Sequence, residues 1–141
     1  MPSRSTLRLW LPPLLWTAVI FAASSASFSS TNTGGFLQKL IHALGVNWVN
    51  PTAFEVVHFM IRKLSHVAEY GILSILVYRA VRADRPGRNL RWTLAAILFA
   101  AVVGSLDEWH QAFVPGRTAT PWDTVIDTLG AALAQVLFFR T

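Results

Sequence analysis

The chain has 141 residues, of which 53% are hydrophobic and only 13% are charged, and its formal net charge is +5. A soluble domain usually carries about 25% charged residues, so the composition argues against a soluble enzyme. Nucleic-acid binding is also disfavoured, because the basic residues lie in short loops beside apolar runs, where membrane topology explains them. The absence of cysteine excludes disulfides and thiolate metal ligands. With no linker or repeat, we expect one domain over residues 1–141.

Four apolar runs approach the roughly 20 residues that a membrane-spanning helix needs. They predict an all-α membrane bundle with short loops and spans at about 9–28, 59–81, 92–113 and 121–139. The first run ends in small residues that also resemble a signal-peptide cleavage region, so an uncleaved span and a cleaved signal both stay open. Residues 36–44 have one apolar face, which predicts a short surface helix before the Asn50-Pro51 break.

The basic residues orient this bundle through the positive-inside rule. Placing both termini and the loop around residues 82–91 in the cytoplasm puts eight of the 12 Lys and Arg residues on that side. The remaining four are Lys39, Arg62, Lys63 and Arg117. The prediction is therefore a multi-pass protein with cytoplasmic termini.

Polar and ionisable residues of three spans meet in the outer half of the predicted bundle. By helical spacing they share three faces, formed by Arg62, His66 and Glu69, by Asp107 and Gln111, and by Asp123 and Asp127. The last two faces continue stripes of small residues, which mark close helix packing in membranes. We therefore expect the acids to face the bundle interior. An ionisable group inside a span costs about 2.5–3.5 kcal/mol at mid-membrane, so the cluster predicts a functional site.

Three motifs between residues 63 and 134 resemble those of the VanZ-like family. They are Lys63-Leu-Ser-His66-Val-Ala-Glu69-Tyr70, Asp107-Glu108-Trp-His-Gln111 with the turn Pro115-Gly116-Arg117, and Asp123-x-x-x-Asp127-x-x-Gly130. The resemblance implies a protein of the bacterial cytoplasmic (inner) membrane and a link to the cell envelope. The family takes its name from a member linked to resistance to the glycopeptide antibiotic teicoplanin, so antibiotic resistance is one function that the resemblance implies.

Asp127 departs from the family pattern, which often has Asn at this position. An amide can donate a hydrogen bond and an ionised carboxylate cannot. We therefore expect Asp127 to be protonated or to pair with Arg117 or His66, unless its role differs from that of the family residue.

The favoured hypothesis is a site that binds or modifies a lipid or a cell-envelope precursor. Its candidate catalytic residues are His66, Glu69, Asp107 and Asp123. Its candidate substrate-binding residues are Lys63, Tyr70, Glu108, Gln111, Arg117 and Asp127. Lys63 and Arg117 would hold a phosphate or carboxylate. His66 would act as a base oriented by Glu69, and Asp107 or Asp127 would act as the acid.

Two alternatives stay open. His66-x-x-Glu69 and Asp107-x-x-His110 each place two possible metal ligands one turn apart, as a metal-dependent membrane hydrolase could use, although neither has a required spacing and we expect no metal or other cofactor. Alternatively, the protein is not an enzyme and the cluster holds the helices, or a homo-oligomer, together. Transport is disfavoured, because the four short spans show no broken-helix pattern. The expected partners are membrane lipids, and nucleic acid is not expected.

Overall fold

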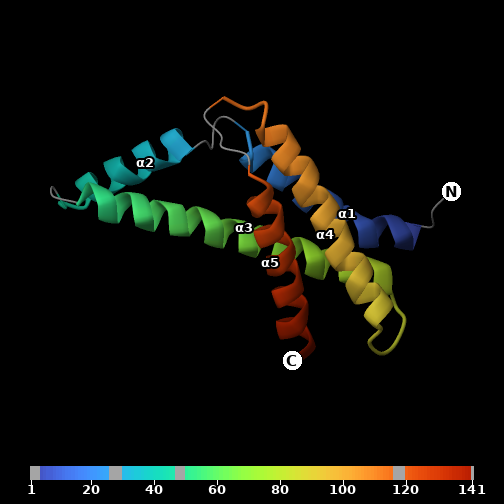
Figure 1. Cartoon of the computed structure of the whole chain (residues 1–141). Helices are drawn as coiled ribbons and strands as arrows, with labels where there is room; N and C mark the ends of the chain where they lie inside the picture. Colours follow the sequence, from blue (N-terminus) through green and yellow to red (C-terminus); the bar gives the residue numbers. More distant parts are fainter. Residues whose placement is uncertain (1–3, 26–29, 47–49, 116–119, 141) are drawn as a thin grey trace.

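A computed structural model describes residues 4–25, 30–46, 50–115 and 120–140 of the chain. These residues form five helices, which are α1 (Arg4–Ala23), α2 (Ser30–Ala43), α3 (Pro51–Arg82), α4 (Leu90–Gln111) and α5 (Pro121–Arg140) (Figure 1). The described part of the chain contains no strand, so the all-α prediction is confirmed.

The helix boundaries differ from the predicted ones most clearly around α2 and α3. Helix α2 begins at Ser30 rather than at residue 36, and α3 begins at Pro51 rather than at residue 59. The early start of α3 has a local cause, because the Asn50 side chain accepts hydrogen bonds from the backbone N–H groups of Thr52 and Ala53 at 2.9 and 3.2 Å. With proline in the first turn, this is a well-capped helix start. Helix α1 ends at Ala23, and the last predicted residues of that span, 26–28, lie outside the described residues.

Helix α3 is the axis of the fold. Helices α1, α4 and α5 pack around its C-terminal half, while α2 lies beside its N-terminal half and extends with it away from the bundle as an arm (Figure 1). The core combines large α3 side chains with small side chains of its neighbours. Its fully buried members include Tyr70, Leu73, Val77, Tyr78, Ala96, Ala100 and Ala131. Small residues on α4 and α5 therefore let both helices approach α3 closely.

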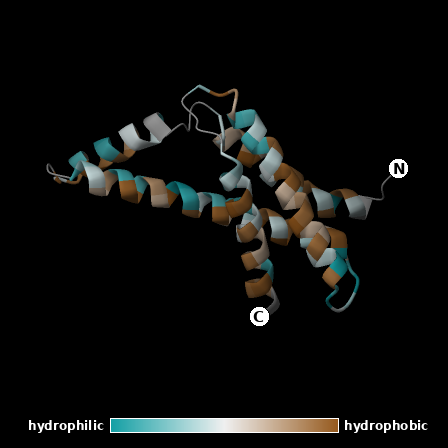
Figure 2. Cartoon of the chain, in the orientation of Figure 1, coloured by the Kyte–Doolittle hydropathy of each residue, from teal (hydrophilic) through white to brown (hydrophobic). Residues whose placement is uncertain are grey.

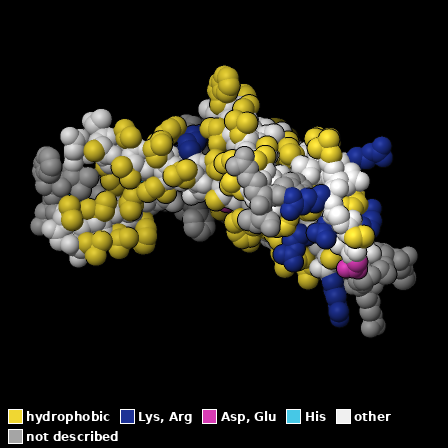
Figure 3. Space-filling model, turned by 90° about the horizontal axis from the view of Figure 1, so that it is seen from below, with side chains coloured by type: hydrophobic (Ala, Val, Ile, Leu, Met, Phe, Trp, Pro, Cys, Tyr) yellow, Lys and Arg dark blue, Asp and Glu magenta, His cyan; other side chains and the backbone are white. Residues whose placement is uncertain are grey.

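The outside of the bundle is apolar to a degree that is unusual for a soluble protein. Large hydrophobic side chains are exposed on every helix, for example Leu15, Phe36, Leu64, Leu98 and Leu133. Figure 2 shows hydrophobic residues on all of the helices, and Figure 3 shows hydrophobic side chains spread over one face of the molecule. Two segments, Thr6–Ala23 and Leu90–Gln111, are long and apolar enough to cross a membrane.

The basic side chains gather at the end of the molecule away from the arm (Figure 3). Four arginines around the α3–α4 connection are exposed, namely Arg79, Arg85, Arg88 and Arg91. Arg85 also packs over the ring of Trp92, with its guanidinium carbon 4.7 Å from the ring centre. The molecule is therefore asymmetric, with this basic end opposite the α2–α3 arm.

Candidate functional site

The predicted acids lie inside the bundle, where α3, α4 and α5 meet. Asp107, Gln111 and Asp127 are each 1% exposed, and Asp123 and Glu108 are 7% and 8% exposed. The small-residue stripes make this possible. A Cβ added to Gly104 would lie 3.1 Å from Oδ2 of Asp127, so glycine leaves the room that this carboxylate occupies. The expectation that the faces formed by Asp107 and Gln111, and by Asp123 and Asp127, lie in the bundle interior is confirmed.

One oxygen of Asp107 collects hydrogen bonds from three parts of the chain. Oδ2 accepts from the Ser24 hydroxyl at 2.8 Å, from the Gln111 amide at 2.8 Å and from the Tyr70 hydroxyl at 3.2 Å. Ser24 directly follows α1, Tyr70 belongs to α3, and Asp107 and Gln111 belong to α4. Asp107 therefore ties three helices together through a buried polar network, in which a lost acceptor is costly.

Two side-chain pairs join α3 to α5, about one helical turn apart. Lys63 Nζ forms an ion pair with Oδ1 of Asp123. His66 Nδ1 lies 3.0 Å from Oδ1 of Asp127. One of the pairings predicted for Asp127, the one with His66, is therefore present. Asp127, rather than the predicted Glu69, is the carboxylate that bonds Nδ1 of His66.

Glu108 and Arg117 take no part in these two α3–α5 pairs. The Glu108 carboxylate accepts a hydrogen bond from the backbone N–H of Thr120, immediately before α5. This contact satisfies a backbone donor beside the start of α5, so Glu108 has a structural partner of its own. Arg117, predicted to bind a phosphate or carboxylate, lies outside the described residues.

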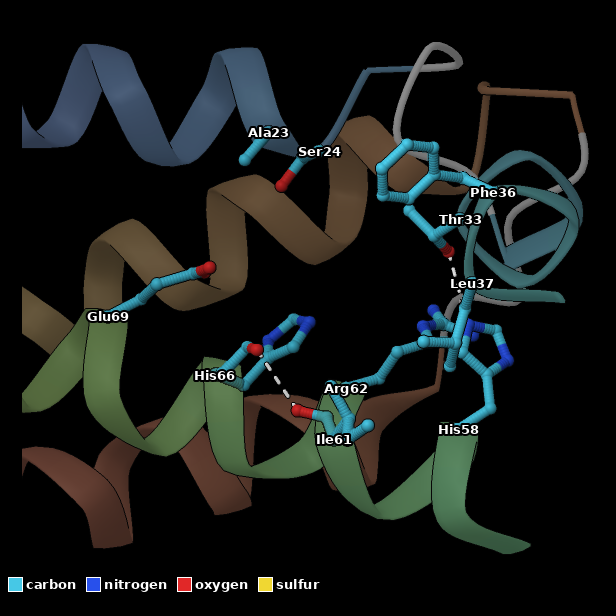
Figure 4. Close-up of a pocket in the computed structure, with 11 residues that line it drawn as sticks. Ala23, Ser24, Thr33, Phe36, Leu37, His58, Ile61, Arg62, His66 and Glu69 are labelled. Atoms are coloured by element: carbon cyan, nitrogen blue, oxygen red, sulfur yellow. Dashed lines mark hydrogen bonds between the residues drawn. The ribbon is translucent and has the colours of Figure 1, made fainter. Parts of the chain in front are cut away.

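A pocket of about 320 Å³ opens between the end of α1, α2 and α3 (Figure 4). Arg62, His66 and Glu69, predicted to share one face of a helix, all line it. Its opposite wall includes Phe36 and Leu37 of α2, so the pocket combines a charged side with an apolar one. We call it the α1–α3 pocket. It has the size and mixed lining of a small-ligand site.

A second pocket, of about 310 Å³, lies on the other flank of α3, against the start of α5. Lys63 and Asp123 line it together with Phe59 and Trp122. Arg62 and His66 line both pockets, whereas Asp107, Glu108 and Gln111 line neither. The predicted site residues thus divide into a group that lines pockets and a group that is enclosed in the bundle.

The described residues offer no set of metal ligands that would support a metal-dependent hydrolase. No group of three or more His, Asp or Glu side chains there is placed to hold a metal ion. His66 bonds Asp127, and the ring of His110 packs edge-on against Phe21 with the ring centres 5.9 Å apart.

Several residues of the site were not predicted from the sequence. Ser24 bonds Asp107, and the Trp16 indole N–H donates to the backbone carbonyl of Glu69 at 2.9 Å, which ties α1 to α3. Ser24 stands in a run of small residues that suggested a cleavage region, and nothing in that run indicates its partner. A polar pair deeper in the bundle, Gln135 donating to Ser74 at 2.8 Å, had a usable signal, since both are polar residues in apolar stretches.

Comparison with known proteins places the chain in a family. No curated protein and no solved structure matches it. A family model described as VanZ/LLP1 matches residues 9–140, which is nearly the whole chain and more than the half covered by the three motifs. All ten predicted site residues fall within that match. The chain belongs to the VanZ/LLP1 family.

Proposed function

We propose that the protein is a four-span membrane protein whose α1–α3 pocket binds the anionic headgroup of a lipid or lipid-linked cell-envelope precursor. The observation that carries this proposal is Arg62, a half-buried arginine that lines a partly apolar pocket. Among the described residues no acidic side chain pairs with it. An unpaired guanidinium beside an apolar wall favours an amphiphile with a phosphate or carboxylate group.

The membrane arrangement rests on the apolar exterior and the basic end. In this proposal α1, α4, α5 and the C-terminal two-thirds of α3 are the four spans, and the arginines between α3 and α4 face the cytoplasm of a bacterial cell. Helix α3 has 32 residues, and at 1.5 Å per residue it is about 48 Å long, longer than the roughly 30 Å hydrocarbon core. Its N-terminal third, with α2, then lies at the outer surface.

Cysteine labelling tests this topology, since the chain has no cysteine of its own. Asp84→Cys, in the α3–α4 connection, and Gln38→Cys, on α2, are both at exposed positions. In intact cells a membrane-impermeant maleimide is expected to label Gln38→Cys and to spare Asp84→Cys. Permeabilised cells are the control and should show labelling of both. Labelling of Asp84→Cys in intact cells would contradict the proposed orientation.

The polar cluster has two parts with different proposed roles. Tyr70 and Gln111 both donate hydrogen bonds to Oδ2 of Asp107 inside the bundle, which supports a structural role for this group. Arg62, His66 and Glu69 line the α1–α3 pocket, where a bound headgroup could meet them (Figure 4). A purely structural role therefore fits the group around Asp107. It does not fit the group around Arg62, which lines the α1–α3 pocket.

Arg62→Gln is the direct test of headgroup binding. We expect native mass spectrometry of the purified protein to show an anionic lipid retained by the wild type, and about tenfold lower retention by Arg62→Gln, because one charge-assisted contact is lost. Arg91→Gln is the matched control. It also removes one positive charge, at an exposed position on α4, and it should retain the lipid. Equal loss in both variants would mean that net charge, not the pocket, governs retention.

A second candidate function, modification of the bound lipid, is favoured by the His66–Asp127 pair. A carboxylate bonded to Nδ1 holds the imidazole in one orientation, as in known base and orienter pairs. His66 then presents its other ring nitrogen as a general base beside Arg62, which lines the same pocket. Resistance to teicoplanin, which the family name implies, stays a prediction.

A further inference from the structure

The second pocket, between α3 and the start of α5, has a chemistry of its own. We call it the α3–α5 pocket. It shares only Arg62 and His66 with the α1–α3 pocket. Figure 4 shows the Arg62 side chain extending toward His58, on the side of the α1–α3 pocket. The charged groups that belong to the α3–α5 pocket alone are Lys63 and Asp123, which form an ion pair in its wall.

This ion pair selects against a simple anion. The Lys63 and Asp123 side chains are 27% and 10% exposed, so the pair is reachable but largely withdrawn from water. The Lys63 ammonium is also held 5.3 Å from the centre of the Phe59 ring. A lone phosphate that took Lys63 would leave the Asp123 carboxylate without a counter-ion, which is unfavourable in a buried setting. A headgroup with both a phosphate and an ammonium avoids this, because it replaces one ion pair with two.

The surroundings of the pocket match the depth of phospholipid headgroups. Trp122 and Phe59 line it and are 74% and 55% exposed. Exposed aromatic rings at the end of a span are typical of the membrane interface. Below them on α5, Val125 and Leu129 present further exposed apolar side chains along which acyl chains could lie.

We propose that the α3–α5 pocket binds a zwitterionic phospholipid with a primary ammonium, of the phosphatidylethanolamine type. Lys63 receives the phosphate and Asp123 receives the ammonium, while Trp122 and Phe59 pack on the glycerol and upper acyl chains. This inference rests on the proposed membrane placement of α5, and it does not depend on headgroup binding in the α1–α3 pocket.

The test compares three lipids by native mass spectrometry of the full chain. Phosphatidylethanolamine carries both charges and N–H donors, phosphatidylcholine carries both charges without N–H donors, and phosphatidylglycerol carries only the phosphate. In the Arg62→Gln background, which removes the anionic-lipid retention proposed for the α1–α3 pocket, the protein is expected to retain phosphatidylethanolamine over the other two by about tenfold, because only this lipid can donate charge-assisted hydrogen bonds to Asp123. Asp123→Asn is expected to abolish that preference.

Two further variants keep the test decisive. Trp122→Ala removes a wall of the pocket at a 74% exposed position, so the bundle should still fold, and phosphatidylethanolamine retention should fall. Glu55→Gln is the matched control, since Glu55 is exposed on α3 and lines neither pocket, and it should leave retention unchanged. Equal retention of all three lipids by Arg62→Gln, or full retention of phosphatidylethanolamine by Trp122→Ala, would overturn the inference. If Arg62→Gln still loses an anionic lipid in that case, the proposed function of the α1–α3 pocket stands alone.

Discussion

Gly130→Ala is expected to lower the free energy of unfolding by about 3 kcal/mol, at the upper end of overpacking effects. A Cβ at this position would lie 2.7 Å from the carbonyl oxygen of Val67 and 2.8 Å from its Cα. Both are backbone atoms of α3, which cannot rotate away as a side-chain end could. Helices α3 and α5, which make the most extensive contact in the fold, would have to separate. The pairs Lys63–Asp123 and His66–Asp127 span the same interface and would be strained with it.

Gly35→Ala is the matched control for this substitution. Gly35 lies in α2, and an added Cβ there meets nothing within 4 Å. Alanine at this position should be neutral or stabilising by about 0.5–1 kcal/mol, since glycine is a poor helix former. Thermal unfolding of wild type and both variants in the same detergent would measure the contrast. If Gly130→Ala unfolds at the same temperature as Gly35→Ala, this result would contradict the close approach of α3 and α5.

Asp107→Ala is expected to cost about 3 kcal/mol of stability, because each buried donor left without an acceptor costs about 1–3 kcal/mol. The donors are the hydroxyls of Ser24 and Tyr70 and the amide of Gln111. Asp107→Asn should cost much less. Its amide oxygen can take the position of Oδ2, and its amide nitrogen can take that of Oδ1, which accepts no hydrogen bond from the described residues.

The informative result is whether Asp107→Asn has a higher free energy of unfolding than Asp107→Ala. Asp84→Ala, at an exposed loop position, is the control and should leave stability unchanged. Tyr70→Phe should cost less in the Asp107→Ala background than in the wild type, because the hydrogen bond is already absent there. If Asp107→Asn and Asp107→Ala are equally destabilised, the negative charge of Asp107 matters more than its role as a hydrogen-bond acceptor.

Helical periodicity was enough to predict which residues are buried together. The spacing of Gly104 and Asp107 on one helix, and of Asp127 and Gly130 on the next, places each acid on the same face as a glycine. The structure confirms that both faces are buried against α3 and that the glycines make room for the contact. Periodicity is a local property, so it can be read from consecutive residues without knowing the tertiary fold.

The partners of these residues could not be predicted in the same way. Ser24 bonds Asp107 across 83 positions of sequence, and Trp16 bonds Glu69 across 53. Such contacts depend on how α1 docks on the bundle, which no single-helix pattern encodes. For the same reason, the division of the cluster into an enclosed group around Asp107 and a pocket-lining group around Arg62 emerges only when the helices are placed together.

The start of α3 was misjudged because two local signals compete there. The Asn50-Pro51 pair indicates a break after the preceding apolar segment, and it also forms a good helix start, with a capping side chain followed by proline. Residues 51–58 contain polar and charged side chains, which made a membrane span starting at residue 59 the simpler interpretation. In the structure they continue α3 beyond the bundle, and His58 of this extension lines the α1–α3 pocket together with Phe36 and Leu37 of α2.

In this proposal, the group around Asp107 is structural and the group around Arg62 binds a lipid. The most direct test is to compare lipid retention and thermal stability in two variants, Arg62→Gln and Tyr70→Phe. We expect Arg62→Gln to unfold at the wild-type temperature and to have lost the anionic lipid. Tyr70→Phe is predicted to unfold at a lower temperature and to keep the lipid in the protein that remains folded. If instead the wild type retains no specific lipid and both variants only lose stability, the whole cluster is structural and the α1–α3 pocket is not a binding site.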